Sequence, residues 1–247
     1  MILRGDALTI LPTLPAASVD LVVTDPPFAI EFTGTKPNYN RDHSNVIPGY
    51  REVTAADYPT FTRAWMQEAW RILKPDGSMY VVSGWTNLKD ILNALDAVGF
   101  TTVNHIVWQF QFGVFTRRKY VSSHYHVLYV VKNPRRYTYH LEARHPLAER
   151  TATGGSANYA DREDVWYIPR EFWPGRKKTA TKLPEALVEK MLDYSSDPGD
   201  TVLDPFFGSG TVGAVARRMG RQWIGIEIVD AYADFAAERL NDNLSYI

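Results

Sequence analysis

The chain has 247 residues, of which 45% are hydrophobic and 22% charged, as in a globular protein with a sizeable core. It contains no cysteine, which excludes disulfides, thiolate metal sites and a thiol nucleophile. No apolar run is long enough to cross a bilayer, and residues 1–6 lack a signal-peptide pattern, so we expect a cytoplasmic protein with no membrane contact.

The formal net charge is only −1, but the charge is unevenly distributed. Residues 105–182 contain 14 Lys and Arg against 6 Asp and Glu, so the rest of the chain is acidic. A basic segment in an acidic body indicates a face that binds a polyanion, although a solvated charged surface has the same composition.

The N-terminal half alternates between strand and helix patterns. Four apolar runs predict buried strands: residues 21–24, 78–82, 103–112 and 125–131. Apolar residues at helical spacing predict two helices, residues 57–73 and 88–98, ended by Pro75-Asp76-Gly77 and by Gly99 respectively. The polar stretch at residues 31–54 is too long for an ordinary connection and predicts a functional loop.

The C-terminal half begins without periodicity, from residue 133 to about residue 173, and we interpret this part as an insert on the sheet. Regular patterns then return as a helix, a strand, a glycine-rich turn with its helix, a strand and a last helix: residues 184–194, 201–203, 208–219, 223–228 and 230–241. These patterns predict a single α/β domain over residues 1–247, with a doubly wound, mostly parallel sheet.

The sequence Gly208-Ser-Gly210-Thr-Val-Gly213 follows a predicted strand and opens a predicted helix. Glycines let the chain turn tightly and let a ligand approach the backbone, and Glu227 at the end of the next strand can accept hydrogen bonds from a ribose. A tight strand–helix turn without a ligand is the structural alternative. Too few residues follow Glu227 for the second half of a dinucleotide site, and Asp204-Pro-Phe-Phe207 adds an acid and aromatics, so a single-nucleoside cofactor fits best.

A second motif, Asp25-Pro-Pro-Phe28, ends the predicted strand at residues 21–24. Prolines have no N–H and a nearly fixed φ, so their carbonyls can point outward as acceptors beside the Asp25 carboxylate. Phe28 adds a flat apolar face, and the group has the shape needed to hold an aromatic amine. The alternative is a turn that ends a strand, with Phe28 in the core.

Together the two motifs resemble those of amino-group DNA methyltransferases that use S-adenosylmethionine. Asp25-Pro-Pro-Phe28 matches the catalytic D/N/S-P-P-Y/F/W motif of that family, and Asp204-Pro-Phe-Phe-Gly-Ser-Gly-Thr211 matches its cofactor loop. The order of the motifs, with a target-recognition insert at residues 133–173 between them, is similar to the β-type permuted arrangement. Three shorter matches are Arg4-Gly-Asp6, Leu73-Lys-Pro-Asp-Gly77 and Thr181-Lys-Leu-Pro-Glu-Ala-Leu187.

The resemblance implies a Rossmann-like class I methyltransferase fold and two sets of site residues. The catalytic set is Asp25, Pro26, Pro27 and Phe28. The cofactor-binding set is Asp6, Ala7, Thr24, Asp25, Lys182, Asp204, Pro205, Phe206, Phe207, Gly208, Ser209, Gly210, Thr211 and Glu227. The chain departs from the family at Leu183, which separates Lys182 from the proline, and at Phe28, where tyrosine is commoner.

The resemblance also implies a reaction. Hydrogen bonds from an exocyclic amine to the Asp25 carboxylate and the Pro26 carbonyl would direct the nitrogen lone pair at the methyl donor, in a nucleotide flipped out of the duplex and stacked on Phe28. Aspartate at the first motif position favours adenine N6, by family analogy, with cytosine N4 as the alternative. Methylation at cytosine C5 is excluded because the related enzymes use a cysteine.

Double-stranded DNA is the expected partner. Eight basic residues are expected to contact its phosphates: Arg117, Arg118, Lys119, Arg135, Arg136, Arg176, Lys177 and Lys178. The short insert favours a homodimer, which would enlarge the DNA-reading face, and the family suggests a cognate restriction endonuclease. No metal is required, and His124 and His126 are interpreted as structural.

Other functions share parts of this pattern. A nicotinamide-dependent oxidoreductase would use the glycine turn and Glu227 but not Asp25-Pro-Pro-Phe28. A non-catalytic DNA-binding module would use only the basic insert. Within the enzyme class, the acceptor amine could belong to RNA or to a protein amide.

Overall fold

A single eight-stranded sheet forms the centre of the computed structural model, which describes residues 1–29, 47–49, 52–111, 117–143, 162–171, 179 and 181–241. The strands lie in the order β1-β8-β7-β2-β3-β5-β4-β6, and only the pairs made by β5 are antiparallel. Their bounds are β1 (Ile2–Arg4), β2 (Val19–Thr24), β3 (Leu73–Ser83), β4 (Thr101–Gln109), β5 (His124–Val131), β6 (Val165–Tyr167), β7 (Thr201–Asp204) and β8 (Gln222–Glu227). The predicted mostly parallel sheet is therefore confirmed.

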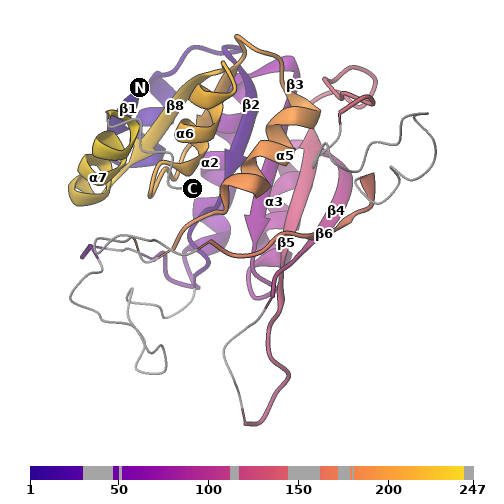
Figure 1. The fold of residues 1–247 in the computed structure, drawn as a ribbon, viewed down its shortest axis with the longest axis vertical. Helices are drawn as coiled ribbons and strands as arrows, with labels where there is room; N and C mark the ends of the chain where they lie inside the picture. The colour runs from indigo at the N-terminus through magenta and orange to yellow at the C-terminus, as the bar shows by residue number, and fades with distance from the viewer. Residues whose placement is uncertain are drawn as a thin grey trace.

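Helices cover both faces of the sheet (Figure 1). Helices α2 (Tyr58–Ile72) and α3 (Leu88–Val98) bury Trp65 and Leu95 against one face. Helices α5 (Glu185–Ser195) and α6 (Thr211–Arg218) pack on the other face, and α7 (Asp230–Asn241) lies at the β1–β8 end. A short α1 (Ala7–Ile10) and the 3₁₀ turn η1 (Leu11–Thr13) connect β1 to β2. None of the described helices is long and apolar enough to span a membrane.

The start of β3 differs from the prediction, in which Pro75-Asp76-Gly77 ends the helix and the next strand begins at Ser78. The α2 helix ends at Ile72, and β3 begins at once with Leu73 paired to Val19. The pairing then shifts, and Ser78 is the partner of Leu21, so the proline and the glycine lie in an irregular stretch inside the strand. Proline is tolerated there because its missing N–H has no regular ladder partner to lose.

The insert contributes to the sheet, which the sequence pattern did not indicate. Residues Val165 to Tyr167 form β6 and pair in parallel with Val107 to Gln109 of β4. Three residues are too few to show a strand period. Residues 144–161 of the insert, and most of the predicted functional loop at residues 31–54, lie outside the described residues.

The order of the strands identifies one special position in the sheet. From β2 the chain continues to its neighbour β3, whereas from β7 it continues to β8 on the opposite side. The contact between β2 and β7 is therefore the point where the winding reverses, and open α/β sheets bind ligands outside the carboxyl ends of the strands at such a point. Asp25 follows β2 directly, and Asp204 is the last residue of β7.

Candidate active site

Two aspartates meet at this reversal point, the half-buried Asp25 and the buried Asp204. The Thr24 hydroxyl donates to Oδ1 of Asp204 over 3.1 Å, and the Phe206 amide donates to the same oxygen over 3.1 Å. Burial raises the pKa of Asp204 to about 7, against the effect of these two hydrogen bonds. Burial also raises the pKa of Asp25 to about 8, with further contributions from the charges of Asp204 and Glu52. The surroundings of Asp25 and Asp204 therefore do not fully stabilise the ionised forms of the two carboxyl groups.

One oxygen of this cluster has no hydrogen-bond donor among the described residues. Oδ1 of Asp25 is buried and unpartnered, which is costly unless a ligand supplies an N–H or a positive charge. Glu52 holds the far side of the turn, because its Oε2 accepts the Ala29 amide over 3.0 Å. Ala29 has φ +53°, so this bond fixes the strained exit from the motif. The turn thus presents a fixed, unsatisfied acceptor.

Aromatic rings continue from the motif into the β4–β5 pair. The half-buried Phe28 packs edge-on against Tyr125, with 5.4 Å between ring centroids, and Tyr125 lies 5.4 Å from Phe110. The guanidinium of Arg170 stands 3.9 Å from the Phe110 ring centroid, and its charge favours ionised Asp25. Reciprocal hydrogen bonds with the Gln111 side chain fix the Arg170 backbone. Phe28 is thus both part of the core edge and adjacent to the acidic turn.

The glycine turn after β7 is tied to the end of β8. Gly210 is the N-cap residue of α6 and has φ +75°, a conformation that residues with side chains disfavour. Oε2 of Glu227 accepts the Gly208 amide over 2.7 Å, and its Oε1 accepts the Val229 amide over 2.8 Å. Burial raises the pKa of Glu227, while the backbone hydrogen bonds oppose that shift. The carboxylate therefore shapes the turn as well as facing the carboxyl edge of the sheet.

The two phenylalanines of the turn point in different directions. Phe207 is buried and stacks on Trp223 at 5.5 Å, and a Cβ on Gly213 would lie 2.6 Å from its ring. Phe206 is half-buried and contacts Trp65 at 5.6 Å between centroids. Only Phe206 can therefore contribute to the mouth of the site, whereas Phe207 explains why the third glycine of the motif is required.

Three contributors to the site were not singled out by sequence reasoning: Glu52, Arg170 and Arg239. Arg239 of α7 is almost fully buried, and its Nη1 donates to the Ser209 carbonyl and to the Thr211 hydroxyl, each over 3.0 Å. Its Nη2 bonds Oε1 of Glu185 at 2.5 Å. Basic residues in a C-terminal helix are common, so only the tertiary contact identifies this one as a support of the glycine turn.

The remaining predicted cofactor residues divide into two groups. Asp6 and Ala7 follow β1, where Arg4 pairs with Glu227, so they lie beside the glycine turn, and Asp6 caps α1 through the Leu8 amide over 2.8 Å. Lys182 is nearly buried and forms an ion pair with Glu171 at 2.6 Å. Its ammonium is therefore at least partly committed to a carboxylate of the insert.

The predicted DNA contacts lie in different places. Arg117, Arg118 and Lys119 are exposed in the connection from β4 to β5, at the edge that carries Asp25. Arg135 and Arg136 follow β5 at the opposite edge, and Arg136 forms an ion pair with Asp76 at 3.2 Å. The structure does not bring these two together with the motifs. Arg176, Lys177 and Lys178 lie outside the described residues.

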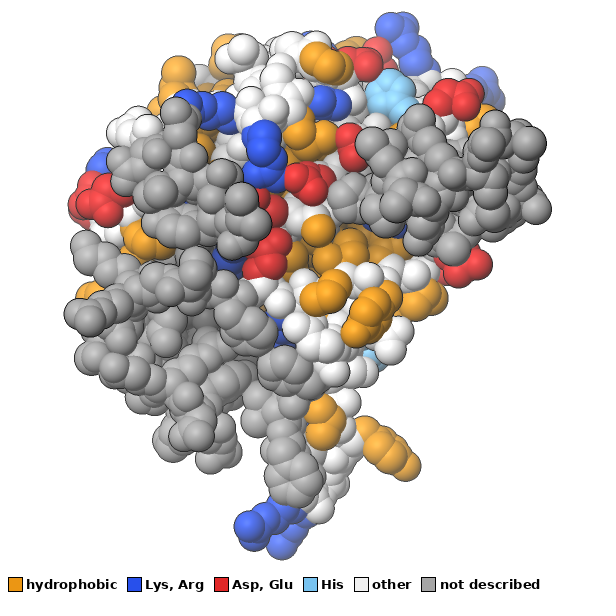
Figure 2. Space-filling model, viewed as in Figure 1, with side chains coloured by type: hydrophobic (Ala, Val, Ile, Leu, Met, Phe, Trp, Pro, Cys, Tyr) orange, Lys and Arg blue, Asp and Glu red, His pale blue; other side chains and the backbone are white. Residues whose placement is uncertain are grey.

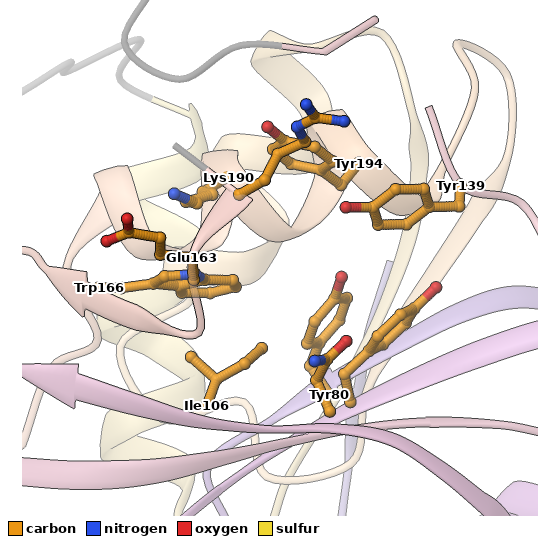
Figure 3. Close-up of a pocket in the computed structure, with 10 residues that line it drawn as sticks. Tyr80, Ile106, Tyr139, Glu163, Trp166, Lys190 and Tyr194 are labelled. Atoms are coloured by element: carbon orange, nitrogen blue, oxygen red, sulfur yellow. The ribbon is translucent and has the colours of Figure 1, made fainter. Parts of the chain in front are cut away.

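The histidines and the described cavity lie apart from these residues. Nε2 of His105 and Nδ1 of His126 are 2.7 Å apart, burial lowers the pKa of His126 to about 4, and no metal-binding group of three is found among the described residues. A cavity of about 30 Å³ beneath α5 is lined by aromatic side chains, including Tyr80 and Trp166 (Figure 3). It contains no predicted site residue and is far smaller than a typical ligand pocket of roughly 300–1,000 Å³.

Comparison with known proteins identifies the family. The family model N6_N4_Mtase, described as DNA methylase, matches residues 19–238. The chain belongs to this DNA methylase family. The Type II methyltransferase M.HpaI of Haemophilus parainfluenzae is 30% identical over 98% of this chain and 74% of its own length. The Type II methyltransferase M.HinfI of Haemophilus influenzae is 32% identical over 98% and 68%, respectively.

A solved structure extends the likeness to the whole fold of the DNA methylase. TTHA0409 of Thermus thermophilus, crystallised in complex with S-adenosyl-L-methionine, matches with a TM-score of 0.70 at 25% identity, over 100% of this chain and 95% of that one. The predicted family, the enzyme class and the Rossmann-like fold are therefore confirmed. A nicotinamide-dependent oxidoreductase and a non-catalytic module are not supported.

Proposed function

We propose that this DNA methylase transfers a methyl group from S-adenosylmethionine to N6 of adenine in a nucleotide flipped out of double-stranded DNA. The observation that carries the proposal is the buried Oδ1 of Asp25, which lacks a donor in the described part of the chain, at the point where the winding of the sheet reverses. An exocyclic amine supplies the N–H donor that this oxygen lacks.

The residues present fit S-adenosylmethionine as the cofactor. Bound at this edge of the sheet, it supplies an electrophilic methyl group on a positively charged sulfonium. Positive charge suits a site with the carboxyls of Asp25 and Asp204, whose pKa values are both raised. Residues 204–211, Glu227 and the neighbouring Asp6 and Ala7 would hold the nucleoside part, by the same backbone and carboxylate contacts that nucleoside sites use in this fold class.

The chain's own residues act mainly by positioning and by charge. The Asp25 carboxylate and the Pro26 carbonyl accept hydrogen bonds from the two N–H groups of the amine, which leaves the nitrogen lone pair directed away from the ring plane. As the methyl group arrives, positive charge develops on the nitrogen, and ionised Asp25 stabilises it in a setting of low polarity where electrostatic interactions are strong. The methylated nitrogen then releases one proton to water, which leaves the neutral secondary amine. Glu52 keeps the acceptor in place through Ala29.

The proposal includes base flipping because the hydrogen-bond acceptor, Oδ1 of Asp25, is buried. Because Oδ1 of Asp25 is buried, an amine inside a stacked duplex cannot reach it. The half-buried Phe28 is the aromatic residue of the motif and would stack on the flipped base. Such stacking stabilises a bound base by about 1–3 kcal/mol. Adenine is proposed ahead of cytosine because aspartate stands first in the motif, as in the adenine enzymes that the sequence resembles.

Assembly and recognition belong to the same proposal. Residues 133–173 act as the target-recognition insert of one domain spanning residues 1–247, and a homodimer enlarges the DNA-reading face. A cognate restriction endonuclease is a natural partner, since M.HpaI and M.HinfI are named Type II methyltransferases. Light scattering on the active protein checks the dimer, and a monomer with full activity contradicts it.

Nucleoside mass spectrometry tests the reaction directly. The protein is incubated with unmethylated plasmid DNA and S-adenosylmethionine carrying a deuterated methyl group, and the DNA is digested to nucleosides. Labelled N6-methyladenosine in its deoxy form is expected, and Asp25→Ala should abolish it. Label on N4 of deoxycytidine would support the cytosine alternative, and label only in added RNA or protein would contradict a DNA substrate.

A further inference from the structure

Residues 117–123, which lead into β5 and are called the arm below, lie at the edge of the sheet that carries Asp25 and extend away from it (Figure 1). Its base continues the antiparallel ladder, because the Phe110 amide donates to the Ser123 carbonyl over 2.9 Å. Beyond this pair the arm extends away from the body, and Figure 2 shows Lys and Arg side chains at its tip with hydrophobic side chains close by. The arm therefore presents its tip outward and not to the core.

The tip combines three cations with an exposed aromatic ring. Arg117, Arg118 and Lys119 are all exposed, and the adjacent Tyr120 and Val121 are 98% and 40% exposed. A tyrosine exposed to this degree contributes almost nothing to the folded core. Cations match the phosphates of a nucleic acid, and an aromatic ring matches the faces of its bases, so the two together match a duplex better than either does alone.

The root of the arm is attached to the catalytic motif. Tyr125, the second residue of β5, lies 5.4 Å from Phe28 and 5.4 Å from Phe110, measured between ring centroids. Tyr120 precedes Tyr125 by five residues, which span at most about 17 Å in extended chain. The major groove is about 12 Å wide, so the tip and the motif can engage one duplex together.

We propose that Tyr120 inserts into the base stack of double-stranded DNA as a wedge while Arg117, Arg118 and Lys119 hold the flanking phosphates. This inference rests on the proposed function, because it gives the arm a part in base flipping. A nucleotide that leaves the stack loses its stacking contacts, and an inserted ring replaces some of them and kinks the duplex. The flipped state then becomes more favourable relative to the stacked one.

A plasmid relaxation assay tests insertion without knowledge of the target sequence. Plasmid DNA is relaxed by a topoisomerase in the presence of saturating full-length protein, and the topoisomer distribution is compared for the wild type, Tyr120→Ala and Tyr120→Trp. An inserted ring unwinds the duplex, so the wild type and Tyr120→Trp should shift the distribution and Tyr120→Ala should not. An equal shift with Tyr120→Ala overturns the proposal.

The salt dependence of DNA binding provides the matched control. Tyr120→Ala should weaken binding to fragments of the same plasmid about 5- to 160-fold, the range for loss of one stacking contact, with no change in the slope of log affinity against log salt. The triple variant Arg117→Ala/Arg118→Ala/Lys119→Ala should lower that slope by up to about 2.7. A reduced slope with Tyr120→Ala would mean a phosphate contact and overturn the wedge.

Labelled methyl transfer on the same plasmid separates the two proposals. Methylated DNA with no topoisomer shift from the wild type leaves the proposed function intact and overturns the wedge. A shift that depends on Tyr120, without any methylated base, supports the wedge and overturns the proposed methyl acceptor.

Discussion

Two regions at the same edge of the sheet differ in nearly every physical property. The turns after β2 and β7 are buried and acidic, and hydrogen bonds such as that from Thr24 to Asp204 fix them. The arm around Tyr120 is exposed and basic. The first region should respond to changes in protonation and burial, and the second to changes in salt. Substitutions in the two regions are therefore expected to affect different measurements.

The largest effect is expected from Asp25→Asn. The amide cannot stabilise the positive charge on the methylated nitrogen, so the rate of methyl transfer should fall about 10²–10³-fold, as when an active-site electrostatic contact is removed. The salt slope of DNA binding should not change. Single-turnover kinetics with labelled S-adenosylmethionine measures the rate, and Asp20→Asn, at the other end of β2, is the control that should keep activity.

Asp25→Asn should also be more stable than the wild type at high pH. The folded-state pKa of Asp25, about 8, lies above its ordinary value of 3.8, so the folded protein binds the proton more tightly and loses this stabilisation as pH rises towards 8. Asparagine cannot ionise, and calorimetry of the cofactor-free protein should show the largest gain in Tm above pH 8 and little gain near pH 4. Activity above a tenth of the wild-type rate would contradict the catalytic assignment.

The acidic region was largely predictable because its chemistry is local. Asp25-Pro-Pro-Phe28 and the glycine turn contain residues whose backbone preferences restrict the conformation, and the structure places both turns on adjacent strands. The helix ended by Gly99 was predictable for the same reason, since its C-cap has φ +100°. Residue types with restricted or unusual backbone geometry thus carried most of the predictive signal.

Contacts between distant segments were not predictable in this way. Arg239 reaches Ser209 across 30 positions of the chain, and β6 is a strand only because β4 offers it an edge. Glu52 holds the turn through the backbone amide of Ala29, a contact that its side-chain type does not indicate. The sequence around Arg239 and Glu52 does not distinguish them from ordinary surface charges. Arg135 lies at the opposite edge of the sheet from Asp25, so a basic run in the sequence does not indicate where its residues lie relative to the site.

A smaller effect is expected at Glu227, which belongs to the acidic turns and is proposed to bind the cofactor. Glu227→Gln loses the charge that strengthens the hydrogen bonds to Gly208 and Val229, each of which belongs to the charge-assisted class worth about 1.5–3 kcal/mol. Calorimetric titration should show S-adenosylmethionine binding weakened about tenfold or more, with an unchanged salt slope for DNA. Glu189→Gln, on the exposed side of α5, is the control, and equal weakening by both variants would contradict a role at the cofactor.

The smallest effect is expected at Arg170, which joins the two regions because it stacks on Phe110 at the root of the arm and acts electrostatically on Asp25. Removing its charge with Arg170→Met should raise the pKa of Asp25 further, since a nearby cation favours the carboxylate. The rising limb of kcat/KM against pH should then move to higher pH, with a loss of less than about tenfold at pH 7 that disappears above the new pKa. Arg170→Lys should restore the profile. A loss of equal size at every pH would instead assign Arg170 to the support of the arm, and the acidic and basic regions would then act independently.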